Sequence, residues 1–437
     1  MTTEHLAILQ SVAQRFGTPC YVYFLDSIRE RVALLKTAFE GLFSISYAVK
    51  SNPNLGLLRR IGGMVEYLDV SSAGEIARAL RAGWPAAMLT FTGPGKTESE
   101  LAFAVEVGVG EIVLESADEA RVLKELVRRT GRRQRVLLRI APERVPRGFG
   151  LVMGGRATPF GIDQEQLDET VAFVVSSPEL ELDGFHVFAA SQCLRVEPLV
   201  EYYEIVTRLF RQTCERLHLS PRTFVFGSGL GIPYHPEESP LDLSALALRA
   251  LPMLRQFAQW ACARRKDATL VLETGRYLVG EAGVYLAGVT RIKRSHGQTI
   301  AICDGGMHQH LTAAGHLGGV IPRNFKITKV YSTAKSDGEQ VYTLVGPLCT
   351  TLDTLARSIS LPRLSPGDVI AVWASGAYGL TASPWHFISH PPPKEIVVES
   401  VSGESLAIDE SDFGPLWWPA EASVAVANHN GTNEQQG

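Results

Sequence analysis

The stretch FSISYAVKSNPN, residues 43–54, shows the pattern that the first half of the chain repeats. Aromatic, β-branched and small residues run from Phe43 to Val49, which predicts a buried strand. The run stops at Lys50 and a turn that contains Pro53. Seven further short runs predict strands of the same kind: Glu66–Val70, Met88–Phe91, Ile112–Leu114, Val136–Ile140, Gly184–Phe188, Phe224–Phe226 and Leu270–Glu273.

Apolar residues at helical spacing lie between these runs. The predicted helices include Glu75–Ala82, Ser99–Val107, Ala117–Arg129, Gln164–Val175, Leu199–Leu217 and Leu243–Arg264. Strands that alternate with helices imply a parallel sheet, and eight such units predict a (β/α)8 barrel over residues 27–278. An open doubly wound sheet, which usually has fewer strands, is the structural alternative.

The sequence changes character after about residue 280. Short β-branched segments separated by Gly, Pro and Asp, such as Thr299–Cys303 and Val341–Val345, predict a mostly antiparallel β domain over residues 279–419. We expect residues 1–26 to form a helix and a strand, with the strand Cys20–Phe24 joining that domain. Residues 420–437 end in NHNGTNEQQG and are predicted to be a disordered tail.

Composition excludes several classes of protein. A net charge of −4 gives no reason to expect nucleic acid as a partner. No apolar run approaches the roughly 18 residues of a membrane span, and MTTEHLAILQSVAQRF resembles an amphipathic helix more than a signal peptide. The six cysteines contain no CxxC pair, which favours reduced thiols in a cytoplasmic protein over disulfides or a metal site: Cys20, Cys193, Cys214, Cys262, Cys303 and Cys349.

Catalytic groups of a (β/α)8 barrel project from the carboxyl ends of its strands, and Lys50 stands at the first of these ends. Lysines at strand ends are commonly surface residues. At a barrel mouth, however, a desolvated amine can lose its proton and attack a carbonyl group.

Two later strand ends carry groups that could bind the same ligand. The loop Gly227–Gly231 could be a simple turn, but glycines after strand seven can bring backbone amides close to a phosphate, and Arg276 could bind the same anion. Glu273 could form a structural ion pair with Arg139, or it could keep a pyridine nitrogen protonated. An amine, a phosphate site and a carboxylate together describe one cofactor.

These motifs resemble the fold-type III pyridoxal-phosphate decarboxylases, the group that contains diaminopimelate, ornithine and arginine decarboxylases. The resemblance runs from about Thr18 to Val398. It rests on YAVKSNPN (47–54), LDVSSAGEI (68–76), GSGLGIPY (227–234), ETGRYLV (273–279), GPLCTTLD (346–353) and SGAYG (375–379).

The resemblance implies pyridoxal 5′-phosphate as cofactor and removal of the α-carboxylate of an amino acid as the reaction. It implies that Lys50 carries the cofactor as a Schiff base, that Glu273 pairs with the pyridine nitrogen, and that Cys349 protonates the carbanion. In this family the cysteine comes from the partner subunit, which implies a homodimer. Asp69 and Arg139 are expected to support the lysine and the ring oxygen. The phosphate contacts are expected from Ser191, Gly227, Ser228, Gly229, Gly231, Arg276 and Tyr378, and Gly275 is expected to be a further cofactor-binding residue.

Three departures from the family pattern bear on the ligands. Phe188 stands where the family has a histidine that stacks on the cofactor ring, and an aromatic face can still stack there. Thr350 replaces the acidic residue that grips the distal amine of basic substrates, which argues against ornithine, lysine or diaminopimelate. The segment DGGMHQHL, residues 304–311, replaces a Met-Asn-Asp type segment. The candidate substrate contacts are His308, Gln309, His310, Thr350 and Asp353.

The blocks FTGPGKTESEL (91–101), GFHVFAASQ (184–192) and SGAYGLTASPWHFISHP (375–391) resemble one branch of the family. That branch contains decarboxylases associated with exosortase clusters, with siderophores and with glutamate tethered to a carrier protein. Three alternatives remain open: a racemase or epimerase on the same scaffold, a non-catalytic regulator of the same fold, and a Schiff-base aldolase without a cofactor.

Overall fold

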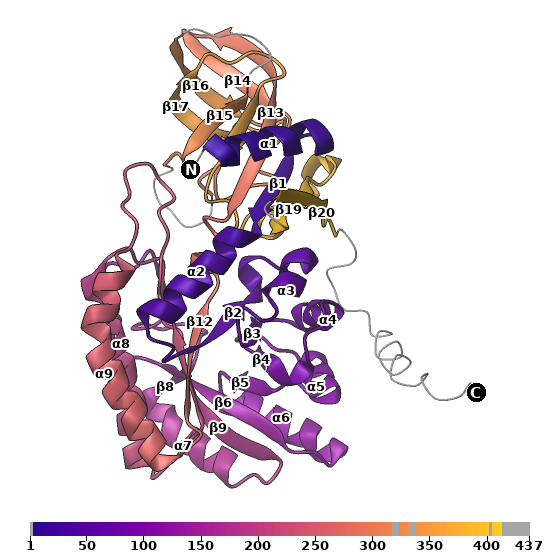
Figure 1. The fold of residues 1–437 in the computed structure, drawn as a ribbon. Helices are drawn as coiled ribbons and strands as arrows, with labels where there is room; N and C mark the ends of the chain where they lie inside the picture. Colours follow the sequence, from indigo (N-terminus) through magenta and orange to yellow (C-terminus); the bar gives the residue numbers. More distant parts are fainter. Residues whose placement is uncertain (1–2, 317–322, 332–337, 402–403, 413–437) are drawn as a thin grey trace.

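The computed structural model describes residues 3–316, 323–331, 338–401 and 404–412. The predicted tail, residues 420–437, lies outside the described residues. Figure 1 shows two parts, a barrel and a β domain that lies above it in this view.

The barrel is a closed ring of eight parallel strands, which confirms the predicted fold class. Neighbouring strands pair in parallel around the ring, and β2 pairs with β12 to close it, so the open-sheet alternative is wrong. The strands in ring order are β2 (Ser44–Ala48), β3 (Tyr67–Val70), β4 (Leu89–Phe91), β5 (Glu111–Leu114), β6 (Gln134–Ala141), β9 (Leu180–Val187), β11 (Thr223–Gly227) and β12 (Thr269–Thr274).

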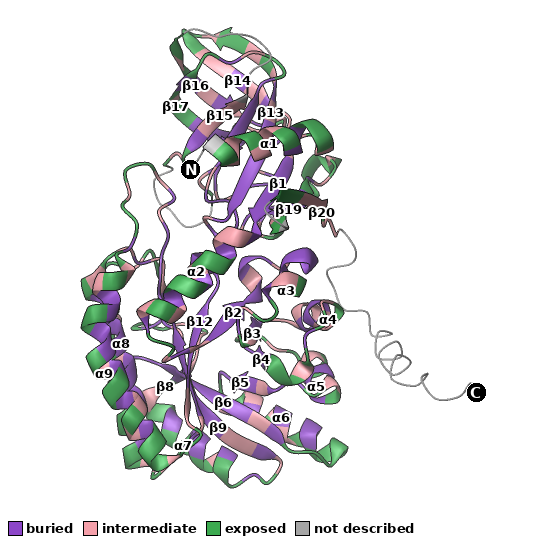
Figure 2. Ribbon diagram, in the orientation of Figure 1, coloured by how far each residue is buried: buried purple, intermediate pink, exposed green. Residues whose placement is uncertain are grey.

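Helices cover the outside of the barrel, and Figure 2 shows the buried strands enclosed by helices that expose only their outer faces. Local sequence explains where several helices begin: Thr97 and Glu100 form a reciprocal capping box at the start of α5, and Gly108 ends that helix in the left-handed region. The helices are α2 (Leu25–Ala38), α3 (Leu55–Ile61), α4 (Ala73–Arg81), α5 (Glu98–Val107), α6 (Ala117–Thr130), α7 (Gln164–Val175), α8 (Val196–Arg216), α9 (Leu243–Arg264) and the short α10 (Arg276–Val279).

A small flap follows β6. Strand β7 (Leu151–Val152) pairs antiparallel with β10 (Ala190–Ser191), and β8 (Ile162–Asp163) pairs in parallel with the end of β6. This flap brings the loop of residues 142–161 beside the carboxyl end of β9.

The second part is a mixed sheet in which six of the eight strand pairings are antiparallel. Strand β1 (Cys20–Phe24), from the N-terminal segment, lies between β13 and β19 in this sheet, while α1 (Thr3–Phe16) packs on it. The other strands are β13 (Gly283–Ser295), β14 (Gln298–Cys303), β15 (Ile327–Tyr331), β16 (Glu339–Val345), β17 (Thr354–Pro362), β18 (Val369–Val372), β19 (Lys394–Val401) and β20 (Glu404–Asp409).

Among the described residues, no helix is long and apolar enough to cross a membrane. All six cysteines fall in the described part and are free thiols, with Cys262 and Cys349 exposed and the other four buried.

Candidate active site

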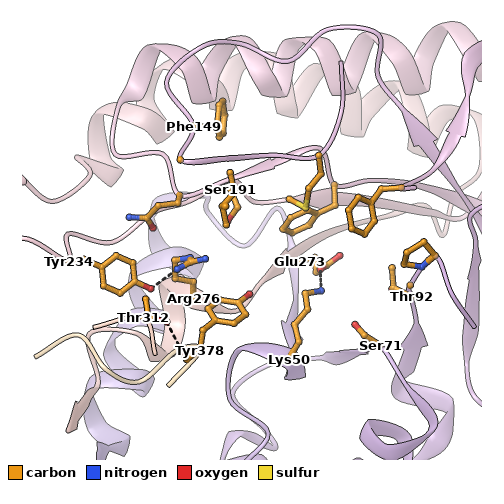
Figure 3. Close-up of a pocket in the computed structure, with 18 of the residues that line it drawn as sticks. Lys50, Ser71, Thr92, Phe149, Ser191, Tyr234, Glu273, Arg276, Thr312 and Tyr378 are labelled. Atoms are coloured by element: carbon orange, nitrogen blue, oxygen red, sulfur yellow. Dashed lines mark hydrogen bonds and ion pairs between the residues drawn. The ribbon is translucent and has the colours of Figure 1, made fainter. Parts of the chain in front are cut away.

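A cavity of about 1000 Å³ opens at the carboxyl ends of the barrel strands and contains Lys50 (Figure 3). Its lining comes from the ends of strands β2, β3, β4, β6, β9 and β12, from the flap, from the loop after β11 that carries Tyr234, and from β-domain residues that include Thr312, Phe325 and Tyr378. The position agrees with the rule that barrel enzymes react at this face. Of the predicted cofactor and catalytic residues, the cavity lining includes Lys50, Arg139, Phe188, Ser191, Glu273, Arg276 and Tyr378.

Lys50 lies in the single turn that follows β2, with its side chain 36% exposed toward the cavity. Its Nζ is 2.9 Å from Oδ2 of Asp69 and 3.2 Å from Oε1 of Glu273. Burial disfavours the ammonium, but the two carboxylates outweigh burial and raise the pKa of Lys50 above its ordinary value. Desolvation, which can deprotonate an amine at a barrel mouth, is opposed here because the chain pairs Lys50 with two acids.

The two carboxylates differ in their surroundings. Burial would raise the pKa of Glu273, but Lys50, His186 and Arg139 together lower it, so this carboxylate is held ionised. Burial and the neighbouring charge of Glu273 raise the pKa of Asp69. Asp69 is tied on its other side by a hydrogen bond from the hydroxyl of Thr92.

His186 lies directly behind Glu273. Its Nε2 is 2.7 Å from Oε2 of Glu273, and both side chains are almost completely buried. Phe188 follows two residues later on the same face and lines the cavity, with Nζ of Lys50 5.6 Å from the centre of its ring. Gly227 makes room for this ring, since a Cβ there would lie 2.5 Å from a Phe188 carbon.

The far end of the cavity holds a partly buried cation. Nη1 of Arg276 donates to the hydroxyl of Tyr234 at 2.5 Å, and its guanidinium stacks 4.7 Å from the ring of Tyr378. Nε of Arg276 has no hydrogen-bond partner, and no carboxylate pairs with this guanidinium among the residues that the structure describes. Ser191, from β10, also reaches this cavity (Figure 3). Such an end is suited to an anion.

The sequence predicted that the glycine loop after β11 would face the ligand, but in this structure the loop does not line the cavity. Gly227, Ser228, Gly229, Gly231 and Gly275 are absent from the cavity lining. The amide of Ser228 donates to the carbonyl of Glu273, and that of Gly231 donates to the carbonyl of Cys193, both at 2.9 Å. The loop therefore supports β12 in this structure, while Arg276, Tyr234 and Tyr378 line the far end of the cavity.

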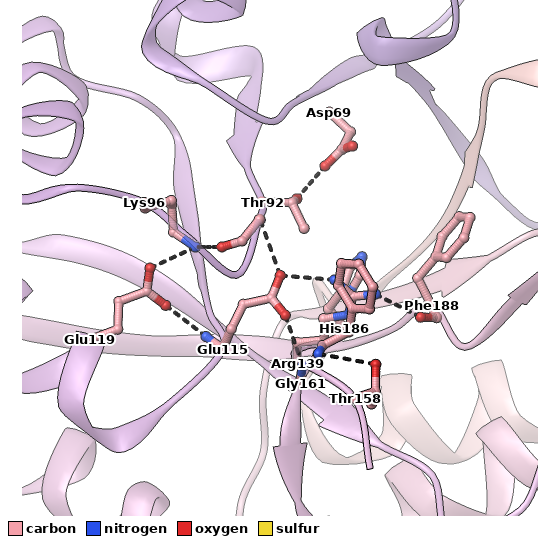
Figure 4. Close-up of polar contacts among 12 residues, drawn as sticks. Asp69, Thr92, Lys96, Glu115, Glu119, Arg139, Thr158, Gly161, His186 and Phe188 are labelled. Atoms are coloured by element: carbon pink, nitrogen blue, oxygen red, sulfur yellow. Dashed lines mark hydrogen bonds and ion pairs between the residues drawn. The ribbon is translucent and has the colours of Figure 1, made fainter. Parts of the chain in front are cut away.

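Arg139 pairs with Glu115, at 2.8 Å, rather than with Glu273 (Figure 4). Its other terminal nitrogen donates to the carbonyl of Phe188 at 2.8 Å. Glu115 also accepts from the amides of Gly93 at 3.1 Å and Gly161 at 2.8 Å. One buried carboxylate thus ties together the loop after β4, the flap and the strand end that carries Arg139.

The segment with the predicted acid lies apart from this chain's own cavity. Cys349 is exposed and Thr350 is partly exposed, and neither lines the cavity. Asp353 is buried, and its carboxylate accepts from the amides of Met307 at 2.6 Å and Leu348 at 2.9 Å. The structure therefore uses Asp353 to hold the Cys349 loop against the 304–311 segment, not to line the cavity.

The three residues of the 304–311 segment that were expected to contact substrate are buried in the β domain and do not line the cavity. The side chain of Gln309 accepts from Tyr285 at 2.6 Å and donates to Pro391 at 3.2 Å. Nε2 of His310 lies 2.8 Å from Oγ of Ser375, and burial lowers its pKa to about 3. Both nitrogens of His308 lack a partner among the described residues.

Four further residues of the site were not predicted: Thr92, Glu115, His186 and Tyr234. Thr92 and Glu115 directly follow the third and fourth barrel strands, so the strand-end rule could have found them. His186 lies two residues before Phe188 and must therefore face the same side of the strand.

Comparison with known proteins agrees with this geometry. A family model for the pyridoxal-binding domain of pyridoxal-dependent decarboxylases matches residues 25–280. The chain is 33% identical to L-glutamyl-[BtrI acyl-carrier protein] decarboxylase of Niallia circulans, over 92% of this chain and 93% of that protein. It is 30% identical to 2-[(L-alanin-3-ylcarbamoyl)methyl]-2-hydroxybutanedioate decarboxylase of Staphylococcus aureus, over 89% and 96%.

Among solved structures, diaminopimelate decarboxylase of Helicobacter pylori in complex with L-lysine superposes with a TM-score of 0.78. It covers 97% of this chain, is itself covered completely, and is 26% identical. The chain belongs to the pyridoxal-dependent decarboxylases, enzymes that use pyridoxal 5′-phosphate to remove the carboxylate of amino acids and their conjugates.

Proposed function

We propose that this chain decarboxylates an amino-acid conjugate, with Lys50 as the cofactor's attachment point, Glu273 as its charged partner and Arg276 as its phosphate contact. One observation carries the proposal. A lysine–carboxylate pair and a partly buried guanidinium that has no carboxylate partner among the described residues line the same cavity.

The residues present fit pyridoxal 5′-phosphate. The unpartnered Nε of Arg276 and the hydroxyl of Tyr234 suit a phosphate group, which needs donors and positive charge. Lys50 and Glu273 supply the amine and the carboxylate that suit a ring carrying a carbonyl group and a basic nitrogen, and Phe188 offers that ring an aromatic face. When bound, the cofactor supplies an aldehyde that condenses with amines and a protonated ring that withdraws electrons from the breaking bond.

The chain's own side chains then have definite tasks. Glu273, held as a carboxylate by His186 and its cationic neighbours, stabilises a proton on the nitrogen that faces it. Asp69 stabilises the ammonium form of Lys50, so this amine can carry a proton whenever it is released from the cofactor.

The proton donor to the reacting carbon comes, in our proposal, from a second subunit. Cys349 is exposed on this chain and lies outside its cavity, as a residue that completes a partner's site would be. The site is then complete only in a homodimer.

The free thiols further favour a reducing compartment, so we propose the cytoplasm.

The substrate we propose is an amino acid with an extended, uncharged or acidic distal part. Thr350 offers no charge to a distal amine. The wall of the cavity away from Lys50 is largely apolar, with Arg195 and Arg323 among the other lining residues. Its apolar lining consists mainly of Phe149, Leu151, Met153, Phe160, Leu194 and Phe325. The two relatives in Niallia and Staphylococcus are named for conjugated substrates of this general kind.

A substrate panel tests this proposal. Purified holoenzyme is incubated with N-acylated diaminopropionate carrying a citryl group, with glutamyl-loaded carrier protein, and with free diaminopimelate and ornithine, while released carbon dioxide is measured. We expect turnover of at least one conjugate and a kcat/KM at least about tenfold lower for both free diamino acids, a difference of about 1.4 kcal/mol.

The same assay, run in deuterated water with chiral analysis of the recovered amino acid, separates the racemase alternative. Recovery of the inverted amino acid with no release of carbon dioxide would show that the enzyme is a racemase and not a decarboxylase. Preference for ornithine or diaminopimelate would leave decarboxylation intact but overturn the proposed substrate class.

A further inference from the structure

A second cavity enters the barrel from the end opposite the active site. It has a volume of about 400 Å³ and begins at the amino ends of the strands, where Met88 and Asp267 are exposed. At its inner end it reaches Asp69, His186 and Glu273. Since the last two residues also line the active-site cavity, this passage meets the catalytic carboxylate from behind.

Small and polar residues keep the passage open. The interior of a barrel is normally filled by layers of branched side chains. Here a small apolar cluster of Val113, Leu137, Val225 and Val271 fills only part of it. The inward positions of the neighbouring strands carry Ser46 on β2 and Thr90 on β4, while Ile45 on the outward face of β2 packs in the main core.

Two buried polar atoms in this passage have no partner in the described chain: Nδ1 of His186 and Oγ of Ser46. Ser46 pairs in register with Glu273, so its hydroxyl lies at the level of the carboxylate that His186 contacts. Nδ1 must bind something in either protonation state, since it is a donor when protonated and an acceptor when not. Buried polar atoms left without a protein partner are usually bound to water, where space allows.

Further polar groups line the passage between Ser46 and the amino-terminal face of the barrel. Glu111, at the start of β5, accepts from the hydroxyl of Thr223 at 3.0 Å and from that of Thr90 at 3.4 Å. Burial and the neighbouring Asp183 raise the pKa of Glu111 to about 7, so this group can exchange protons near neutral pH. Arg135, Arg222 and Asp267 also line the passage.

We propose that the passage holds a chain of water molecules that connects Nδ1 of His186 with solvent at the amino-terminal face of the barrel. The Glu273–His186 pair then exchanges protons with solvent by a route separate from the active-site mouth. The inference rests on the passage and its unpartnered atoms, and it holds whatever substrate the enzyme uses.

The test measures exchange of the imidazole C2 hydrogen of each histidine for deuterium in the holoenzyme by peptide mass spectrometry. Ser46→Leu fills the passage, whereas Ser46→Ala removes the same hydroxyl and leaves space for water. We expect exchange at His186 to be at least about tenfold slower in the Leu variant than in the wild type and the Ala variant. Exposed His218 and buried His310 serve as fast and slow references within the same sample.

A second pair, Thr90→Leu and Thr90→Val, repeats the comparison on β4 and decides the question if Ser46→Leu does not fold. Exchange at His186 as slow as at His310 in the wild type, or equal in the filled and open variants, would overturn the proposal. A crystal structure that shows no ordered water within hydrogen-bond distance of Nδ1 of His186 would overturn it as well.

Discussion

The site gives each acidic residue a different environment, although all of them come from strand ends of one barrel. Glu273 meets a lysine and a histidine, Asp69 meets the same lysine and a threonine hydroxyl, and Glu115 meets an arginine. Neighbouring groups therefore lower the pKa of Glu273 and help to raise that of Asp69, and they give each carboxyl group different contacts. Lys50, Glu273 and Arg276 could be predicted from the sequence because each stands at the carboxyl end of a strand and belongs to a recognisable motif.

Other residues could not be placed from their motifs alone. Gln309 and His310 look like exposed ligand contacts in the sequence, but their polar atoms bond within the β domain. Only tertiary packing decides whether such side chains point into a core or into a site. The state of Lys50 also depends on two carboxylates that lie 19 and 223 positions away along the chain.

Substitution of Glu273 should slow catalysis without loss of the fold. Glu273→Gln keeps the size of the side chain but removes the charge, so we expect kcat to fall roughly 10²- to 10³-fold while the cofactor still binds. Steady-state kinetics and the absorbance of bound cofactor measure the two effects. Glu281→Gln, whose carboxylate pairs with Arg31 and lies outside the active-site cavity, is the control. Equal kcat in both variants would contradict the role of Glu273.

The carboxyl group of Glu75 should make the free energy of unfolding depend on pH. Burial raises the pKa of this carboxyl group from its ordinary 4.5 to about 7, so the folded state binds more protons than the unfolded state between these values. The contribution of Glu75 to stability is therefore full below about pH 4.5 and is lost as the pH rises through 7. Because the residue is partly exposed, we expect a loss of about 1–2 kcal/mol. Urea unfolding at pH 5 and pH 8 should show a smaller difference for Glu75→Gln, and an unchanged difference would contradict this explanation.

Among elements, the barrel strands are the most predictable and the connections the least. All eight barrel strands overlap their predicted ranges, since buried parallel strands are short apolar runs that end in turn residues. The flap of β7, β8 and β10 was not predicted, because two-residue strands leave no periodic pattern. The flap is instead held by Glu115, which follows β5 and accepts a hydrogen bond from the amide of Gly161.

Glu115 should therefore matter for stability as well as for the position of the flap. Glu115→Ala leaves the buried guanidinium of Arg139 without its carboxylate, and we expect the free energy of unfolding to fall by about 3–5 kcal/mol. Glu201→Ala removes an exposed partner of Arg144 and should cost less than about 1 kcal/mol. Chemical denaturation measures both. Similar losses in the two variants would show that Glu115 does not hold these segments together.

For the whole molecule, the barrel supplies the cavity and the β domain closes one side of it with Thr312 and Tyr378 (Figures 1 and 3). The amide of Tyr378 donates to the carbonyl of Ser51 at 2.8 Å, so the β domain is fastened directly beside Lys50. The presence of a β domain after the barrel was predicted from the change of sequence character near residue 280, but its position over the cavity was not. In our proposal the Cys349 loop completes the site of a second chain, a relation that no pattern within one sequence can display.

The proposed shared site predicts complementation between inactive variants. Lys50→Ala and Cys349→Ala should each have little activity, but a refolded or coexpressed equal mixture should recover about a quarter of wild-type activity through hybrid dimers that contain one intact site. Activity of the mixture, together with its mass in solution, measures this. A mixture no more active than its parents, or an active monomer, would contradict a site shared between subunits.

Chemical trapping of the imine identifies the lysine that holds the cofactor, which we propose is Lys50. The holoenzyme is treated with borohydride, which fixes an imine between pyridoxal phosphate and a lysine, and the modified peptide is identified by mass spectrometry. Lys96 is an internal comparison, because it also lines the cavity but is paired with Glu119. We predict a phosphopyridoxyl group on Lys50 alone. Lys50 would not be the attachment point if Lys96 or another lysine were modified instead. The same conclusion would follow if no lysine were modified in a protein that absorbs like a pyridoxal enzyme.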